Sequence, residues 1–361
     1  MIPIAKPLIG DNEKKAVLEV LESGMLAHGK KAKELEKKFA EFIGSKHAVL
    51  TTSGTTALQL MLLAGGIKPG DKIITTAFTF SATADTIAMC GAVPVFVDID
   101  ENSFNISPEA IEHALITVKN IKAIVVVHLY GLPANMNEIM EIAQKYNVQV
   151  YEDAAQAHGA SINGTKVGSI GLAGAFSFYP TKNMTCGGGG IITTNDSNLA
   201  NQAALLANHG QTGPYKHNIL GFNYRSNDIQ AAIGIVQLKN LPSFNRDRQL
   251  NASYYSGNIK NPLITLPTTK KKCRHVYNLY TIKCNQRDKL LSFLQARGIG
   301  AKIYYPTLLQ NQNSIQSYGY IDCGCKVANI VSNQVLSLPV HPSLTTQELK
   351  HIVDTVNDFK G

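Results

Sequence analysis

Short apolar runs alternate with amphipathic stretches along the first half of the chain. Five such runs follow His47, at 48–51, 72–75, 93–97, 123–127 and 148–151. Continuous apolar runs bounded by turns are typical of buried parallel strands, and the intervals between them leave room for crossover helices. The pattern predicts an α/β/α sandwich around a mostly parallel sheet, with ligands at the carboxyl ends of the strands.

The rest of the chain has two further parts. Near the N-terminus, residues 11–22 and 33–42 place apolar residues at helical spacing on either side of a glycine-bracketed loop. After Pro242 the pattern changes. It predicts helices over 246–255, 286–297 and 346–359, and strands over 279–283 and 302–305. We therefore expect a large domain over residues 1–245, which includes the N-terminal segment, and a smaller C-terminal α+β domain over 246–361.

The composition is that of an ordinary globular protein. The chain has 361 residues, of which 44% are hydrophobic and 17% charged, so it can bury a substantial core. It contains no apolar stretch long enough to cross a membrane, and its N-terminus lacks the apolar core of a signal peptide. We expect a cytoplasmic protein with no membrane partner.

Charge and cysteine content narrow the possible ligands. The formal charge of +8 can attract an anion such as a nucleotide, but the basic residues are scattered, so we expect no nucleic-acid partner. The six cysteines form no regular disulfide framework. Cys323 and Cys325 could be half of a metal site, but no second pair lies at zinc spacing, so we expect no metal.

A small, hydroxyl-rich turn follows the first strand. Residues 52–56 read Thr-Ser-Gly-Thr-Thr and lead into a helical run. Free backbone N–H groups and the helix dipole make such a helix N-terminus a site for a phosphate. A helix cap by Ser53 or Thr55 would explain the same residues without any ligand.

A pair of carboxylates, Glu152 and Asp153, stands at the end of the fifth apolar run. A carboxylate in that position lies where ligands bind in parallel sheets. It could also cap the turn that follows. The strand pattern alone does not choose between the two acids.

A lysine follows the next strand. Residues 176–184 form an apolar run that delivers Lys182 at its end, before the glycine run 187–190 and a further strand at 191–194. A lysine that is buried there has a lowered pKa, which makes its amine a nucleophile toward carbonyls. An exposed loop lysine is the alternative.

Residues 176–184 resemble the lysine motif of the DegT/DnrJ/EryC1/StrS family of sugar aminotransferases, and the likeness extends over nearly the whole chain, including 298–306 and 336–342. The resemblance implies the fold type I of PLP-dependent transferases, with pyridoxal 5′-phosphate (PLP) bound covalently to Lys182. It implies a homodimer with active sites at the subunit interface. The amino donor would be an amino acid, by analogy glutamate, and the acceptor a keto-deoxy sugar linked to a nucleoside diphosphate, in amino-sugar biosynthesis.

The resemblance also assigns roles to individual residues. Lys182 and Asp153 would be catalytic, with Asp153 rather than Glu152 paired to the pyridine nitrogen. The other cofactor-binding positions would be the turn Gly54, Thr55 and Thr56 with Ser177 at the phosphate, Phe80 stacked on the ring, Gln156 near the ring, and Asn223 reaching the phosphate of the partner subunit. Without the resemblance, Phe80 would be read as core packing.

Two positions depart from the family pattern. Gly188 stands where relatives commonly have a glutamate, so we expect the loop to keep its shape and lose one polar contact. Gln310 stands where many relatives have a histidine. Two alternative functions remain open: a PLP-dependent nucleotide-sugar dehydratase, against which Lys182 argues because such relatives have histidine there, and a non-catalytic PLP-binding regulatory protein.

Overall fold

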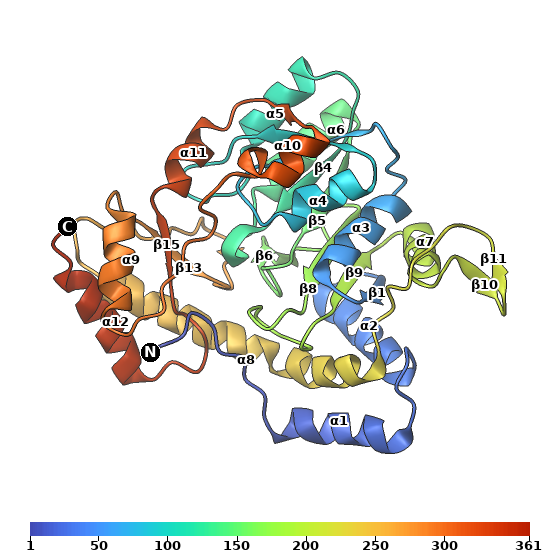
Figure 1. Ribbon diagram of the computed structural model, residues 1–361, viewed down its shortest axis with the longest axis horizontal. Coiled ribbons are helices and arrows are strands. Elements are labelled where there is room, and N and C mark those ends of the chain that lie inside the picture. The colour runs from blue at the N-terminus through green and yellow to red at the C-terminus, as the bar shows by residue number, and fades with distance from the viewer.

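The computed structural model describes residues 1–361 and has one eight-stranded sheet at its centre (Figure 1). Six adjacent strands, from β8 to β14, run parallel, and β9 runs antiparallel between β1 and β8. In spatial order the strands are β1 (His47–Thr51), β9 (Gly190–Thr194), β8 (Ala173–Ser177), β5 (Gln149–Asp153), β4 (Ile121–Val127), β2 (Lys72–Thr76), β3 (Val93–Val97) and β14 (Ile321–Asp322).

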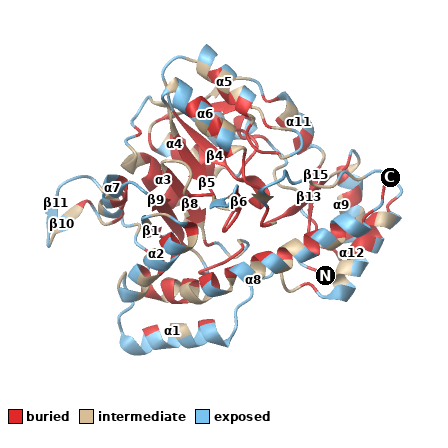
Figure 2. Ribbon diagram, turned by 180° about the vertical axis from the view of Figure 1, so that it is seen from behind, coloured by how far each residue is buried: buried red, intermediate tan, exposed pale blue.

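Helices cover both faces of this sheet. Successive strand residues alternate in direction, so Ile73 packs with the helices of one face and Ile74 with those of the other. Figure 2 shows the buried strands between helices whose outer surfaces are exposed. One face carries α3 (Gly54–Ala64), α4 (Ala82–Met89) and α7 (Ser197–Ala207); the other carries α2 (Lys30–Ile43), α5 (Pro108–Thr117), α6 (Met136–Tyr146) and the first part of α8 (Asp228–Asn258). The predicted α/β/α sandwich is confirmed.

The long helix α8 connects the two parts of the chain. It runs without a break through Pro242 and through residues 245 and 246, where we predicted a division. The expectation that a new helix begins at 246 is therefore wrong. A proline inside a helix removes one backbone hydrogen bond, but Leu238 and Leu241 on one side and Ala252 on the other are buried, and their packing holds the helix together.

The C-terminal part has its own apolar core. Its central elements are β13 (Tyr280–Lys283) and β15 (Val335–Leu338), an antiparallel pair, with α9 (Arg287–Gln295) and α12 (Thr346–Asp358) packed around it and Ile2 of the N-terminus included. The strand that we predicted over 302–305 does not form. Only Lys302 makes a bridge, to Ser337. The chain then turns toward the large sheet, where the hydroxyl of Tyr305 accepts a hydrogen bond from Gln156, just after β5.

Other C-terminal residues return to the large sheet. β14 pairs with the edge strand β3, and it lies between α10 (Asn313–Tyr318) and α11 (Lys326–Ser332) along the chain. The remaining short elements are η1 (Leu129–Gly131), η2 (Leu309–Asn311), β6 (Ser161–Ile162), β7 (Thr165–Lys166) and β12 (Cys273–Arg274).

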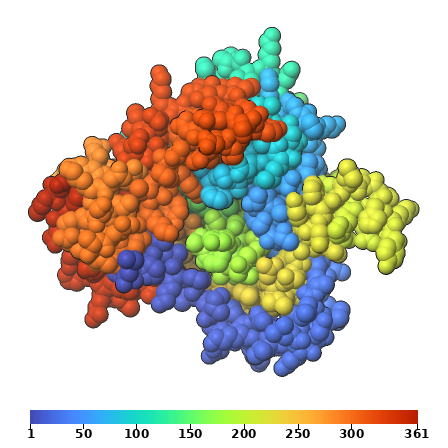
Figure 3. All heavy atoms as spheres, in the orientation of Figure 1, coloured from blue at the N-terminus to red at the C-terminus, as the bar shows by residue number.

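Two segments lie at the margins of the molecule. The helix α1 (Asp11–Ser23) packs against α8, and the hairpin of β10 (Gln211–Gly213) and β11 (Lys216–His217) projects from the body (Figures 1 and 3). Tyr215 and Leu220, at the hairpin and just after it, are each more than nine-tenths exposed. None of the helices combines the length and the apolar character that a bilayer crossing requires.

Candidate active site

The candidate site lies at the carboxyl ends of adjacent parallel strands. β5 ends at Asp153 and its neighbour β8 ends at Ser177, five residues before Lys182. The helix α4 begins just after the neighbouring segment 77–81 and carries Thr83 in its first turn. Ligands bind at this edge of α/β sheets because the loops and helix N-termini converge there.

Asp153 is buried and accepts two hydrogen bonds from the protein. Its Oδ2 accepts a hydrogen bond from the Oγ1 of Thr83 at 2.7 Å, and its Oδ1 accepts one from the backbone N–H of Ala155 at 3.2 Å. Burial raises the pKa of Asp153, and these two bonds, together with the charge of Lys182, oppose the rise. A carboxylate with this environment favours a nearby positive charge.

Lys182 lies in the field of Asp153. Burial lowers the pKa of its amine to about 8, and the charge of Asp153 opposes that effect. The side chain is half-buried, and its Nζ forms no hydrogen bond or ion pair with another residue. A substantial fraction of such an amine is neutral near pH 8 and is therefore nucleophilic.

Glu152, the other acid of the pair, faces the opposite side of the sheet. Its Oε1 accepts from the backbone N–H groups of Ile170 and Gly171, both at 2.8 Å. Its Oε2 accepts from the N–H of Gly168 at 2.7 Å and lies 2.9 Å from Nε2 of His128. All of its acceptor positions are used within the protein, so Glu152 has nothing to offer a ligand.

Gln156 belongs to a small polar network beside Asp153. Its Oε1 accepts from the backbone N–H of Tyr130 at 2.7 Å, and its Nε2 donates to the hydroxyl of Tyr305 at 2.9 Å. The ring of Phe80, which is 58% exposed, lies 6.2 Å from that of Tyr305. Phe80 therefore presents most of its surface to a possible ligand rather than to the core.

The turn before α3 has the properties of both a cap and an anion site. Ser53 caps the helix, because its Oγ accepts from the N–H of Thr56 at 3.1 Å. The backbone N–H groups of Gly54 and Thr55 have no partner. A Cβ on Gly54 would come within 2.7 Å of the Cβ of Ser177, so glycine is required for the turn and the serine to lie in contact.

Asn223 lies next to this turn along the neighbouring segment, since the N–H of Thr52 donates to the carbonyl of Tyr224 at 2.9 Å. The side chains of Asn223 and Arg225 are exposed, and neither forms a hydrogen bond or an ion pair with another residue of the same chain.

The two departures from the family pattern have different surroundings. Gly187 and Gly189 have φ of 76° and 103°, which favour glycine, whereas Gly188 does not. A Cβ at Gly188 would lie 3.3 Å from Nε2 of Gln230, so a side chain there would point toward α8. Gln310 is buried, and its Oε1 has no hydrogen-bond partner.

These residues fit PLP. Two free N–H groups and the hydroxyl of Ser177 suit a phosphate, the carboxylate of Asp153 suits a cationic ring nitrogen, and the amine of Lys182 suits an aldehyde. When bound, PLP supplies a carbonyl for amines and a ring that takes up electrons. Sequence reasoning did not single out Thr83 and Tyr305, because nothing in their local sequence indicates that they meet residues 153 and 156.

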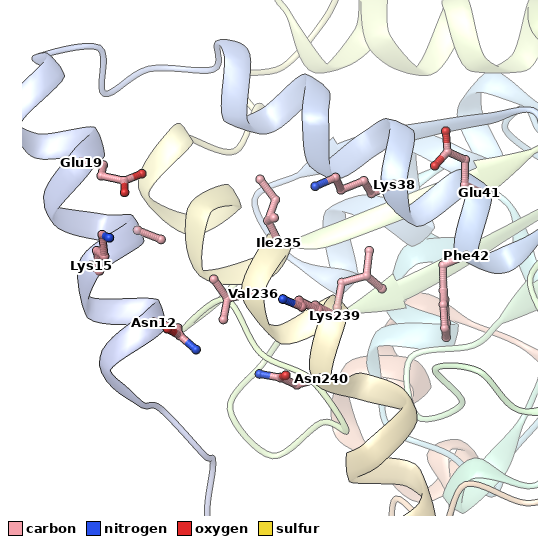
Figure 4. A pocket seen from close by; sticks show the side chains of 12 residues that line it. Asn12, Lys15, Glu19, Lys38, Glu41, Phe42, Ile235, Val236, Lys239 and Asn240 are labelled. Carbon is pink, nitrogen blue, oxygen red and sulfur yellow. The ribbon is translucent and has the colours of Figure 1, made fainter.

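A separate groove of about 750 Å³ lies between α1, α2 and α8 (Figure 4). Lys15 and Glu19 of α1 line one wall, and Lys38 and Glu41 of α2 line the other. It contains none of the predicted catalytic or cofactor-binding residues. Lys239 of α8 also lines it, so three lysines face two glutamates and the lining has a small positive excess. Because the groove has no aspartate and no strand end, it is not a second candidate for the active site.

Comparisons with known proteins agree on one family. The model of the DegT/DnrJ/EryC1/StrS aminotransferase family matches residues 7–357. The chain is 40% identical to a protein of Geobacillus stearothermophilus named pleiotropic regulatory protein, over 94% of this chain and 92% of that one. It is 38% identical to UDP-N-acetyl-3-dehydro-alpha-D-glucosamine 3-aminotransferase of Acidithiobacillus ferrooxidans, over 94% and 91%.

Other relatives at 36–38% identity have GDP- or dTDP-linked sugars in their names. Among solved structures, a DegT DnrJ EryC1 StrS aminotransferase of Brucella abortus superposes with a TM-score of 0.93 at 35% identity, covering 97% of this chain and 96% of that chain. Structures of a further similar protein, from Streptococcus pneumoniae, are described as its PLP and PMP forms.

Proposed function

The chain belongs to the DegT/DnrJ/EryC1/StrS aminotransferase family, whose members use PLP, and we propose that it moves an amino group from glutamate to a keto-deoxy sugar linked to a nucleoside diphosphate. The product would be an amino sugar nucleotide. One observation carries the proposal. At the carboxyl ends of the parallel strands, Lys182 has a lowered pKa and interacts with Asp153, a buried carboxylate that accepts only two hydrogen bonds.

We assign the chemistry to two side chains. The Nζ of Lys182, once neutral, takes the proton from the α-carbon of the amino donor and would deliver it to the carbonyl carbon of the cofactor, because its return to the α-carbon would only regenerate the donor. The carboxylate of Asp153 holds the positive charge of the ring nitrogen, which lowers the barrier to loss of that proton. Thr83 favours the ionised form of Asp153, since a hydrogen bond to the charged form lowers the pKa of the carboxyl.

We assign cofactor binding to the remaining predicted residues. Gly54, Thr55, Thr56 and Ser177 would hold the phosphate, and Phe80 would stack on the ring with Gln156 beside it. The exposed Asn223, together with the exposed apolar residues of the β10–β11 hairpin, supports a homodimer in which Asn223 reaches the phosphate of the partner subunit.

The proposal does not assign the nucleotide that carries the sugar. Relatives named for UDP-, GDP- and dTDP-linked sugars have nearly equal identity to this chain, so overall similarity does not choose among them. Lys182 disfavours the dehydratase alternative. The regulatory alternative agrees with the name of one relative, and the intact pair of Lys182 and Asp153 disfavours it.

The test is a panel of UDP-, GDP- and dTDP-linked keto sugars, with glutamate as donor and mass spectrometry of the products. We expect one nucleotide series to yield an amino sugar, and Lys182→Ala to abolish the product and the absorbance of the lysine-bound cofactor while the protein stays folded. Absence of any half-reaction with glutamate or another amino acid would refute the enzyme and favour the regulator. Native turnover by Lys182→Ala would refute the role of the lysine.

A further inference from the structure

Lys182 lies in a segment that has little regular structure to hold it. Residues 178–189 form neither helix nor strand, and the backbone N–H of Lys182 makes a single bond, to the carbonyl of Tyr179 at 2.9 Å. A lysine side chain is long and flexible. Yet a reacting amine must be held close to its productive position, because a displacement of about 1 Å costs roughly 10²-fold in rate. Other residues must therefore hold this segment in place.

The neighbouring residue, Asn183, makes three hydrogen bonds although it is 4% exposed. Its Nδ2 donates to Oδ1 of Asn245 at 2.7 Å and to the carbonyl of Val276 at 2.9 Å. Its Oδ1 accepts from Nδ2 of Asn278 at 3.0 Å. The amide next to the lysine is thus bonded to α8 and to the segment that precedes β13.

Asn245 and Asn278 are themselves buried and anchored. The Nδ2 of Asn245 also donates to the carbonyl of His158 at 2.8 Å, in the loop after β5. The Nδ2 of Asn278 also donates to the carbonyl of Thr181 at 3.2 Å, on the other side of Lys182. The carbonyl of Asn278 accepts from Nη1 of the buried Arg248 on α8. Both residues that flank Lys182 are therefore bonded to Asn278.

Stability alone does not account for this arrangement. Three buried amides must each be desolvated, and an apolar set of similar volume would often be equally stable. A buried hydrogen-bond network instead favours one geometry, since a shift of Asn183 would leave its buried amide unpaired. The network joins four segments that are distant in sequence, and all of them converge on the two peptide units beside Lys182.

We propose that Asn183, supported by Asn245 and Asn278, is a positioning residue that fixes the direction from which Lys182 approaches the carbonyl of the cofactor. The inference deepens the proposed function and rests on it for the identity of the reacting lysine. It makes no use of the identity of the sugar acceptor.

The chain offers a matched control in Asn261, which is 7% exposed in the C-terminal part. Its Nδ2 also donates to two carbonyls, those of Val356 and Phe359, and its Oδ1 also accepts one N–H, that of Leu263. Asn183→Ala and Asn261→Ala thus each remove three side-chain hydrogen bonds. Only the first removes bonds beside Lys182.

The experiment uses the full chain stripped of cofactor and measures how fast added PLP becomes covalently bound, by absorbance. We expect Asn183→Ala to slow this capture about 10-fold, because the amine samples unproductive directions, and Asn261→Ala to leave the rate within about twofold of wild type. In the reconstituted protein, the glutamate half-reaction should slow similarly, without a matching rise in the glutamate concentration needed for half the maximal rate.

Asn278→Ala serves as the second variant, because it leaves both donor bonds of Asn183 in place and so keeps the fold if Asn183→Ala does not. It should slow capture several-fold. Equal capture rates in Asn183→Ala, Asn278→Ala and Asn261→Ala would overturn the proposal. The failure of the proposed function is distinguishable, since a chain that aminates no sugar nucleotide would still show the difference in covalent capture.

Discussion

Glu152 and Asp153 are adjacent acids at the end of one strand, yet their surroundings differ in kind. Glu152 accepts three backbone N–H bonds and lies 2.9 Å from Nε2 of His128. The Nδ1 of His128 accepts a hydrogen bond from the N–H of Ala134. The proton of the ring is therefore on Nε2, which donates a hydrogen bond to Glu152. Asp153 has two donors, Thr83 and Ala155, and beyond these it interacts with the charge of Lys182.

The difference separates a structural carboxylate from a functional one. Both acids are buried, so burial does not distinguish them. The distinguishing property is whether the protein has already satisfied the charge. A buried carboxylate with a full set of donors stabilises the loop that bonds to it, whereas one with few donors retains its capacity for an external cation.

We expect Asp153→Asn to have the largest effect of the substitutions at this strand end. The amide keeps the size of the side chain but cannot balance a positive ring nitrogen, so we expect the amino-transfer rate to fall by about 10³-fold. The free energy of unfolding should change little, because only two bonds to Asp153 are affected. Steady-state kinetics and thermal unfolding measure the two effects.

Glu152→Gln is the matched control, and we expect it to lower the stability and leave the rate unchanged. Its amide group would face N–H donors, so we expect the free energy of unfolding to fall by about 3 kcal/mol. The rate per folded molecule should stay near that of wild type, because the side chain lies on the other face of the strand. Loss of rate without loss of stability in Glu152→Gln would contradict our distinction between the two acids.

Thr83→Val removes one of the two hydrogen-bond donors of Asp153. The bond from Thr83 lowers the pKa of Asp153, so without it that pKa rises further and less of the carboxylate is ionised. We expect kcat/KM to fall about 10-fold, the usual worth of a hydrogen bond to a charged group.

Thr86→Val is the control for this substitution. Thr86 lies on the same helix and is also buried, but its Oγ1 donates to the carbonyl of Thr83 and does not contact Asp153. It should lose some stability and keep its kcat/KM. If both valine variants lose the same activity, the effect belongs to the helix and not to the bond with Asp153.

Much of the fold could be predicted from local patterns. The apolar runs from 48 to 151 correspond to strands of the central sheet, because buried parallel strands have an apolar pattern that is visible in the sequence. The C-terminal part was less predictable. Pro242 suggested a break, but packing on both sides of it keeps α8 continuous. Residues 302–305 make only one bridge, from Lys302 to Ser337 of β15, and then leave that strand, so no further strand forms.

The candidate site shows the same limit. Asp153 is the last residue of β5, and Lys182 lies five residues after the end of β8, so their position at the carboxyl ends of the strands could be predicted. That Asp153 and not Glu152 faces this edge follows from the strand register, which no local pattern reveals. Thr83 lies 70 residues before Asp153, and Tyr305 lies 149 residues after Gln156. Such contacts depend on tertiary structure and have no local sequence signal.

The smallest effect that we predict concerns the proton on Lys182. In the cofactor-free chain, reaction of its amine with acetic anhydride should rise about tenfold per pH unit and level off near pH 8, the value to which burial lowers its pKa. Exposed lysines should continue to gain reactivity above pH 10. Mass spectrometry of the peptide that contains Lys182, with Lys271 as the internal reference, measures both.

The two acids should affect this midpoint differently. The negative charge of Asp153 favours the ammonium form, so Asp153→Asn should move the midpoint below 8. Glu152 contributes no such interaction to Lys182, and Glu152→Gln should leave the midpoint unchanged. Because the folded-state pKa lies below the ordinary value of 10.5, the charged lysine costs stability at low pH, and that cost disappears as pH rises from about 8 to 10.5. A midpoint that moves equally in both variants would mean that Lys182 senses the charge of the strand end as a whole, and the distinction between its two carboxylates would fail.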